Sequence, residues 1–461
     1  STGKRPAWLP ELRSLVALSW PLAVGNLTQI GMGTTDVMMM GSLGPNTLAA
    51  GALGTNLYFM TWIFGIGLLN AVAPMTAREL GRGSPTIRGV RKIVQHGFLS
   101  AGCVAVPCWL ILWWSEPLLV AMGEDAALSA DAGTYVHMLQ WALLPSWCYL
   151  VLRSFVSALE RPIWTLYIGA AAVLVNAAAN WCLMLGHCGC RSLGIAGSGL
   201  ATLLSSLLMF AALGIVVCTV RPFRRYRLFA AFWHSDWPLL RALWRLGLPM
   251  AATLSFEVTM FNAAVFLMGL IGAASLAAHS IAIQLAGLSF MVPLGIGQAV
   301  AVRVGRAYGA QDRKAVGRAG WTAFWLVVAF MATMSLTMIL APRLLISAFL
   351  DTADPGNAEV VGLATSFLAF AALFQIADGT QAVGAGMLRG LHDARMPMLF
   401  ALAGYWGIGL PLGLLLAFPA GLNGIGIWIG LSTGLAVVAC LMIRRWLHRE
   451  ALGLLLLRPE E

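Results

Sequence analysis

Three acidic residues, Asp36, Glu257 and Asp378, lie deep inside otherwise apolar segments of membrane length. A carboxylate at the depth of a bilayer costs a few kcal/mol or more, so a residue of this kind is usually functional. Because the three acids lie on three separate segments, they predict a site that binds cations within a membrane.

Neutral polar side chains accompany the first of these acids. Asn176 and Asn180 are four residues apart on one expected segment and therefore lie on one helix face, and Thr202 lies on the next segment. With Asp36 they provide a carboxylate and several neutral oxygens, a set that suits a hard cation such as Na⁺. Taken alone, the asparagine pair is explained equally well as a hydrogen-bonded helix contact.

Aromatic residues accompany the other two acids. Phe261 is four residues from Glu257, and Phe374 is one turn before Asp378. An aromatic ring near a carboxylate can bind an organic cation by cation–π attraction of about 2 kcal/mol when desolvated. Phenylalanine is common in apolar helices, so the rings are weaker evidence than the acids. One carboxylate holds either a proton or metal ion, or a cationic substrate, and this exclusion predicts antiport.

The composition is that of a polytopic membrane protein. The 461 residues are 59% hydrophobic and 10% charged, against about 25% charged in soluble domains. We expect an all-α chain with twelve spans of about 20 or more residues. The expected spans are residues 15–42, 51–77, 94–114, 135–159, 162–185, 194–220, 246–271, 276–302, 320–340, 360–387, 396–418 and 422–443.

The positive charge lies almost entirely on one side of these spans. Of the 29 Lys and Arg residues, only Arg191 and Arg343 fall on the opposite side. This asymmetry predicts that both termini are cytoplasmic, and it explains the net charge of +10 without a nucleic-acid partner. The loop cluster His187-Cys188-Gly189-Cys190 lacks a partner pair, so neither a metal cofactor nor a disulfide is expected.

The second half of the chain repeats the first half at a constant offset. LRSLVALSWP at residues 12–21 matches LRALWRLGLP at residues 240–249, and Gly41 and Gly44 match Gly269 and Gly272 without a gap. We therefore expect an amino-terminal bundle of six helices (1–220), a cytoplasmic linker (221–245) and a carboxyl-terminal bundle of six helices (246–461). Six spans return the chain to its starting side, which predicts a pseudo-two-fold axis along the membrane normal.

These features together resemble the multidrug and toxic compound extrusion (MATE) family, in its bacterial NorM-type branch. The matching segments are TTDVMMMGSLG at residues 34–44, SFEVTMF at 255–261 and QIADGTQAVGAGMLRG at 375–390. The resemblance covers nearly the whole chain. It implies a monomeric inner-membrane protein, in contact with membrane lipid, that exports cationic drugs and dyes in exchange for inward Na⁺ or H⁺.

The resemblance also implies roles for individual residues. Asp36, Asn176, Asn180 and Thr202 are similar to a cation-coupling site in the amino lobe, with Na⁺ as one possible ion. Glu257, Phe261, Phe374 and Asp378 are similar to a carboxyl-lobe site for cation or substrate. Some relatives have tyrosine where this chain has Phe374, and the lost hydroxyl removes one oxygen that could bind Na⁺ there.

Two other functions fit these residues less well than export of cations. A lipid-linked oligosaccharide flippase of the same superfamily needs a basic cavity for pyrophosphate, whereas the intramembrane charges here are acidic. A polytopic membrane enzyme needs a catalytic cluster such as His with Asp, and the seven His residues lie apart from one another and from the three acids. The acids therefore favour the antiporter.

Overall fold

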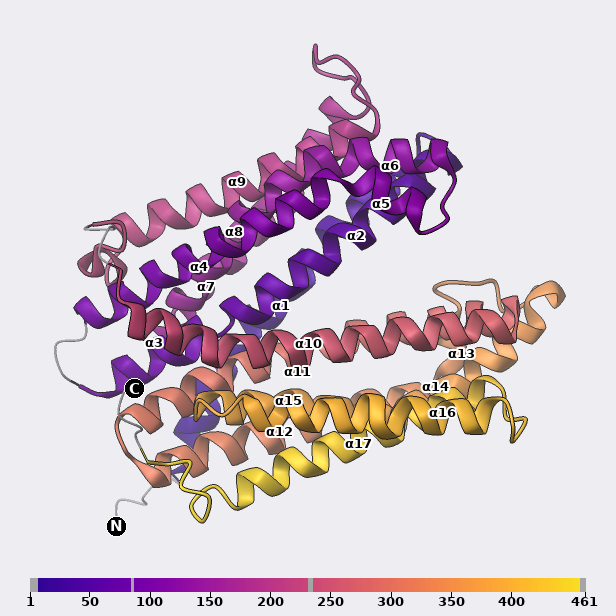
Figure 1. Cartoon of the computed structure of the whole chain (residues 1–461). Coiled ribbons are helices and arrows are strands. Elements are labelled where there is room, and N and C mark those ends of the chain that lie inside the picture. The colour runs from indigo at the N-terminus through magenta and orange to yellow at the C-terminus, as the bar shows by residue number, and fades with distance from the viewer. Residues whose placement is uncertain (1–6, 84–86, 231–234, 457–461) are drawn as a thin grey trace. The chain divides into compact units, whose positions relative to one another are not determined.

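The computed structural model describes residues 7–83, 87–230 and 235–456 (Figure 1). Residues 231–234 of the predicted linker lie outside these ranges. So do the two chain ends, for which a cytoplasmic location stays a prediction. All the regular structure in the described ranges is helical, which confirms the all-α class.

The chain forms two compact units, each described by itself. Within the described residues, the amino-terminal unit is Val24–Ala251, and the carboxyl-terminal unit is the chain from Ala252 to residue 456 together with α1 up to Ala23. The chain leaves one unit for the other within α1 and again within α10, and these two points are equivalent positions of the sequence repeat. The predicted boundaries at 220 and 246 are a separate division of the chain and stay a prediction.

The first half of the chain is built from the following elements: α1 Trp8–Gly41, α2 Pro45–Leu69, α3 Val72–Gly81, α4 Ile87–Trp113, α5 Ser115–Ala121, α6 Ala126–Leu139, the 3₁₀ turn η1 Gln140–Ala142, α7 Leu143–Ala158, α8 Ile163–Leu183, α9 Ile195–Thr219 and the 3₁₀ turn η2 Phe223–Tyr226.

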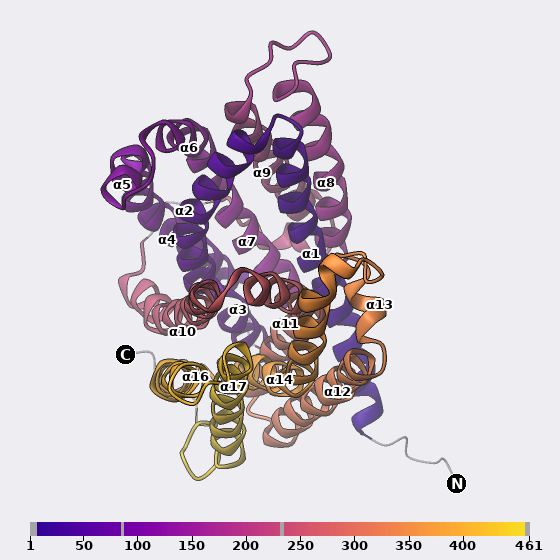
Figure 2. The same cartoon turned by 90° about the vertical axis from the view of Figure 1, so that its right-hand side faces the viewer.

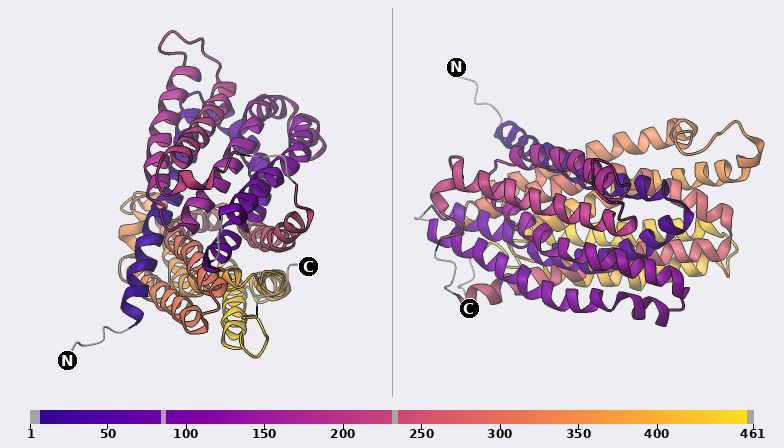
Figure 3. Two further views of the ribbon diagram at one scale, coloured as in Figure 1. Left: turned by 90° about the vertical axis from the view of Figure 1, so that its left-hand side faces the viewer. Right: turned by 90° about the horizontal axis from the view of Figure 1, so that it is seen from above.

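The second half contains α10 Trp237–Ile271, α11 Ala273–Gly309, α12 Arg313–Leu340, α13 Pro342–Ile346, the 3₁₀ turn η3 Pro355–Asn357, α14 Ala358–Gly390, α15 Arg395–Ala401, the π-helix η4 Leu402–Gly409, α16 Leu410–Ala417 and α17 Gly424–Leu447. Within each unit the long helices run side by side (Figure 3).

Within the described ranges, eleven helices are long and apolar enough to cross a membrane. The expected span at 135–159 is interrupted instead, because η1 separates α6 from α7. Pro145 explains the interruption, since it has no N–H to donate to the carbonyl of Trp141. The run from α6 to α7 still provides the twelfth helical segment that the sequence predicts.

Proline also explains a difference between the two repeats. In the first repeat, Pro74 has no N–H for the carbonyl of Asn70, and the helix breaks between α2 and α3. The equivalent position in the second repeat is Val302, and there α11 continues unbroken over the matching residues.

The repeats share one close approach of helices. In the amino-terminal unit Gly67 of α2 lies against the backbone of Ala251, and in the carboxyl-terminal unit Gly295 of α11 lies against Ala23. The two glycines occupy equivalent positions of the sequence repeat, and so do the two alanines. Any side chain at either glycine would overlap backbone atoms, so the glycines are required where these helices cross.

A seam of glycines joins α17 to η4 and α16. Gly430 and Gly434 of α17 lie against Gly404, Gly409 and Gly413. Figure 2 shows α16 nearly end-on, with α17 beside it. A π-helix has a wider turn than an α-helix, so Gly404 and Gly409 face the same neighbour at a spacing of five. Pro411, which cannot donate to the carbonyl of Gly407, favours this wider turn.

We expect Gly430→Ala to destabilise the protein by about 1–3 kcal/mol, because the new Cβ would overlap the backbone of Gly409 and Gly413. Thermal unfolding in detergent, followed by size-exclusion chromatography, would measure the change. Gly287→Ala on α11 is the matched control, since no neighbour lies within 4 Å of a Cβ at that position. Equal melting temperatures for the two variants would contradict the glycine seam.

Candidate functional site

Asp36 is the centre of a polar cluster inside the amino-terminal unit. Its Oδ1 accepts hydrogen bonds from Asn176 Nδ2 at 2.8 Å and Asn180 Nδ2 at 2.6 Å. Its Oδ2 accepts one from the Thr202 hydroxyl at 3.0 Å. Asp36 and both asparagines are buried. The structure thus brings together all four residues that the sequence singles out in this half, from α1, α8 and α9.

The arrangement of donors shows what this cluster can hold. Three donors point at one carboxylate, which satisfies its ionised form in an apolar surrounding. Asn176 Oδ1 accepts from Ser205 at 3.3 Å, whereas Asn180 Oδ1 is buried and accepts no hydrogen bond from the described residues. Rotation of the Asn180 amide would turn that free oxygen toward Asp36. The same residues can therefore bind a metal cation through oxygens, or accept a proton on the carboxylate.

Tyr135 extends the polar cluster. It is buried on α6, lies 3.5 Å by its hydroxyl from Thr55 Oγ1 and interacts electrostatically with Asp36. The sequence does not single out this pair, because a tyrosine and a threonine on two further helices carry no distinguishing pattern. The structure identifies Tyr135 as a neighbour of the carboxylate, with Thr55 beside the tyrosine hydroxyl.

A second polar cluster lies inside the carboxyl-terminal unit. Gln381 Nε2 donates to Glu257 Oε1 and to Asp378 Oδ1, both at 3.2 Å. Gln381 Oε1 accepts from the Tyr405 hydroxyl at 3.0 Å. One amide nitrogen therefore serves two carboxylates. Like charges that converge in an apolar site repel each other, so a proton or a bound cation between them lowers the free energy of the pair.

Two features of the helices build this second cluster. Asp378 and Gln381 are three residues apart on α14 and share one face. Tyr405 is fully buried in the π-helix η4, directly beside Gly404 of the glycine seam, and the close packing there holds its hydroxyl against Gln381. Farther along α14, Arg389 is the cationic side chain that interacts electrostatically with Glu257.

The two predicted aromatic residues lie next to this cluster. The Phe261 and Phe374 rings pack edge to face with centroids 5.9 Å apart, and Phe374 also packs on Trp428 at 5.5 Å. Phe374 is only 1% exposed, so its ring is enclosed by these neighbours. Phe261 is only partly buried, and it is the ring of the two that a ligand can reach.

Sequence reasoning missed Gln381, Tyr405 and a buried pair in the other unit. Gln381 had a usable signal, because it lies three residues after Asp378 within a matched segment. Tyr405 had none, because its position depends on a π-helix. The pair is Arg153 and Asn26. Arg153 Nη2 donates to Asn26 Oδ1 at 2.9 Å, and both residues are buried.

The loop cysteines lie on the surface of the amino-terminal unit. Cys188 and Cys190 are free thiols exposed to solvent. Across the part of the chain that the structure describes, no group of three or more His, Cys, Asp or Glu residues has the arrangement of a metal site.

Comparison with known proteins identifies the family. The profile of the MatE family matches residues 21–182 and 249–415, one match in each repeat. A probable multidrug resistance protein NorM of Mesorhizobium japonicum is 59% identical over 446 residues, covering 97% of this chain and 96% of its own length. A protein of the same description from Brucella suis is 51% identical, covering 96% of this chain and 94% of its own.

Solved structures agree with the fold. A mutant of the Vibrio cholerae MATE transporter VcmN has a TM-score of 0.86 at 16% identity, covering 97% of this chain and 99% of its own. The eukaryotic MATE transporter AtDTX14 has a TM-score of 0.84 at 21% identity, covering 98% of this chain and all of its own. At these identities the likeness concerns the fold, while the curated relatives share most of the sequence. The chain is therefore a member of the MatE family of multidrug efflux transporters, and it is a transporter rather than an enzyme.

Proposed function

We propose that the protein exports organic cations by antiport against inward Na⁺ or H⁺, through alternating access to sites near the middle of the membrane. The observation that carries the proposal is the pair of carboxylates, Glu257 and Asp378, that converge on one amide nitrogen of Gln381. Two acids with one shared donor need a further positive charge when both are ionised, and a cation or a proton supplies it.

In the amino-terminal unit Asp36 is the proposed coupling residue. Three hydrogen-bond donors already satisfy its ionised form, so a proton can bind by displacing a single donor. Na⁺ requires more rearrangement, because at least one asparagine amide must turn its oxygen inward. The present hydrogen bonds therefore support H⁺ more directly, and the unpartnered Asn180 Oδ1 supports Na⁺.

In the carboxyl-terminal unit the carboxylate pair is the proposed site for a cation or for the substrate. Phe261 beside Glu257 gives an organic cation an aromatic contact in addition to the charge. A proton or Na⁺ at the pair removes the negative charge that holds the substrate. The two ligands therefore compete for the same electrostatic attraction, and this competition couples inward movement of one to outward movement of the other.

The family and the charge asymmetry together support a location. The curated relatives are bacterial proteins, and an inner-membrane protein with its basic side in the cytoplasm follows the positive-inside rule. The proposed substrates are cationic drugs and dyes, and the proposed assembly is a monomer. A lipid-linked oligosaccharide flippase is less favoured, because both described clusters present carboxylates rather than cations toward a ligand.

The proposal predicts that ethidium moves in proteoliposomes when an imposed gradient of Na⁺ or of pH is the sole driving force. Each gradient would be imposed separately, and ethidium fluorescence would report transport. Dissipation of the active gradient with an ionophore should stop the movement. Absence of ethidium movement under both gradients would overturn the antiporter.

The same assay tests Asp36. We expect Asp36→Asn to lower the rate of gradient-driven transport by about tenfold or more, corresponding to ~1.4 kcal/mol, because the variant keeps the volume and loses the charge. Asp131→Asn removes an acid from an exposed position on α6 and serves as the matched control. Wild-type rates in Asp36→Asn would rule out a coupling role for this carboxylate.

The hydrogen-bonded chain in the carboxyl-terminal unit predicts an order of effects. Gln381→Leu removes the donor shared by both carboxylates and should lower transport most. Tyr405→Phe only releases Gln381 and should have a smaller effect. Tyr308→Phe, which loses a hydroxyl bonded to the Leu456 carbonyl away from the site, should transport like the wild type. A larger loss in Tyr405→Phe than in Gln381→Leu would contradict this order.

A further inference from the structure

A pocket of about 750 Å³ lies in the carboxyl-terminal unit, and its lining residues are separate from those of the carboxylate cluster. It is formed by the beginning of α1, the first half of α12 and the residues that follow α17. Its principal lining side chains are Trp8, Arg313, Arg318, Trp321, Trp325 and Arg449.

The lining changes in character along α12. Lys314, Arg318, Trp321 and Trp325 are spaced by four, three and four residues, so they form one stripe on the helix. The basic residues occupy the first two turns, and tryptophans followed by Leu326 line the next turns. One end of the pocket is therefore cationic and the other is apolar and aromatic.

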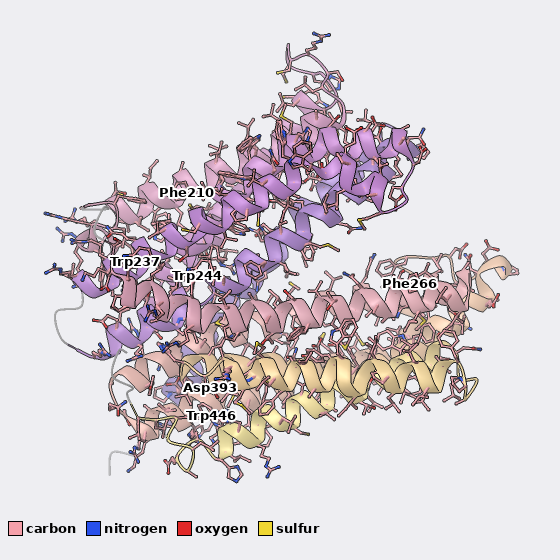
Figure 4. All side chains as sticks on the ribbon, viewed as in Figure 1. Phe210, Trp237, Trp244, Phe266, Asp393 and Trp446 are labelled. Atoms are coloured by element: carbon pink, nitrogen blue, oxygen red, sulfur yellow. The ribbon has the colours of Figure 1, made fainter. Side chains whose placement is uncertain are left out.

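The three pocket cations on α12 lack the ion pairs that other basic residues of the unit have. Arg303 forms an ion pair with Glu11 at 2.5 Å, and Arg445 forms one with Asp393, which is labelled near Trp446 in Figure 4. Among the described residues, in contrast, Arg313, Lys314 and Arg318 form no ion pair. Arg313 and Lys314 also begin a helix, where a positive charge is opposed by the helix dipole.

Arg449 is held at the pocket by specific contacts. Its guanidinium lies 4.8 Å from the centroid of the Trp446 ring, and its Nη1 donates to the Trp446 carbonyl at 3.1 Å. Gly317 of α12 allows this approach, since a Cβ there would lie 3.0 Å from Nη2. The Nε of Arg449 is buried and has no acceptor among the described residues. Glu450 is the acid among the lining residues, against four basic side chains.

We propose that this pocket binds an anionic phospholipid of the leaflet that the basic side faces. Arg318 and Arg449 bind the phosphate, with Arg313 and Lys314 adding positive potential, and an acyl chain lies along Trp321, Trp325 and Ala329. Basic pockets between helices bind anionic head groups in this manner, and tryptophan favours the membrane interface.

The charge and the shape of the pocket select this occupant. Four cations repel the organic cations proposed as substrates, so the pocket is not part of the export route. A free phosphate would fill the cationic end and leave the aromatic end without a partner. An anionic lipid provides a match for both ends in one molecule. The assignment to the cytoplasmic leaflet rests on the proposed orientation, whereas lipid binding itself does not.

Native mass spectrometry of the purified full chain tests the proposal. The protein would be titrated with phosphatidylglycerol and, in parallel, with phosphatidylcholine of the same acyl chains. We expect tighter binding of phosphatidylglycerol, and a loss of at least about tenfold in its affinity when Arg313, Arg318 and Arg449 are all replaced by Gln. Replacement of the same three residues by Lys should retain most of the affinity, because the charges remain.

The matched control removes three charges elsewhere on the basic side, through Arg88→Gln, Arg221→Gln and Arg224→Gln. This control should bind phosphatidylglycerol like the wild type. Equal losses in the two triple-Gln variants, or equal binding of both lipids by the wild type, would overturn the pocket as a lipid site. Binding of inorganic phosphate as tightly as phosphatidylglycerol would show that the cationic end acts alone, and would also overturn the proposal. Elution profiles and melting temperatures would establish that each variant is folded.

Discussion

A carboxylate inside a membrane has no water to stabilise its charge, so the protein must provide the stabilising groups from its own helices. This requirement explains the surroundings of all three intramembrane acids. Asp36 receives donors from two neighbouring helices, and the pair in the other unit shares a donor from α14. Each acid thereby determines which polar residues its neighbouring helices must carry, and at which turn.

The two clusters balance charge and donors differently, and the difference bears on function. Asp36 has three donors for one carboxylate, whereas Glu257 and Asp378 have one shared nitrogen for two. In the first cluster both carboxylate oxygens have hydrogen-bond donors. In the second, even with Arg389 acting on Glu257, negative charge exceeds positive charge when both acids are ionised. The proposed exchange of one cation for another needs a site with such an excess of negative charge, because that excess makes the binding of either cation favourable.

Departures from regular helix geometry occur in both units, and one of them bears directly on a polar cluster. Pro74 and Pro145 interrupt helices that would otherwise continue, and the π-helix η4 aligns Gly404 and Gly409 with α17. The close packing at those glycines fixes Tyr405 against Gln381. At the end of the same unit a glycine has a comparable effect, since Gly317 admits the guanidinium of Arg449 and so completes a cationic pocket.

Much of the protein was determined by the sequence alone. Hydropathy identified the helices, the constant offset between matching segments identified the repeat, and the matched motifs identified the family, because these properties depend on residue type and spacing along a single helix. The helix face shared by Asn176 and Asn180 is predictable for the same reason, and the face shared by Asp378 and Gln381 could have been predicted from the sequence in the same way.

Only the tertiary structure decided that Tyr405 anchors Gln381, that Arg153 pairs with Asn26 and that the cations at the start of α12 join Arg449. Each of these contacts joins residues that are distant in sequence. The geometry of the contacts depends on how closely two helix backbones approach, and residue spacing along a single helix does not predict that distance.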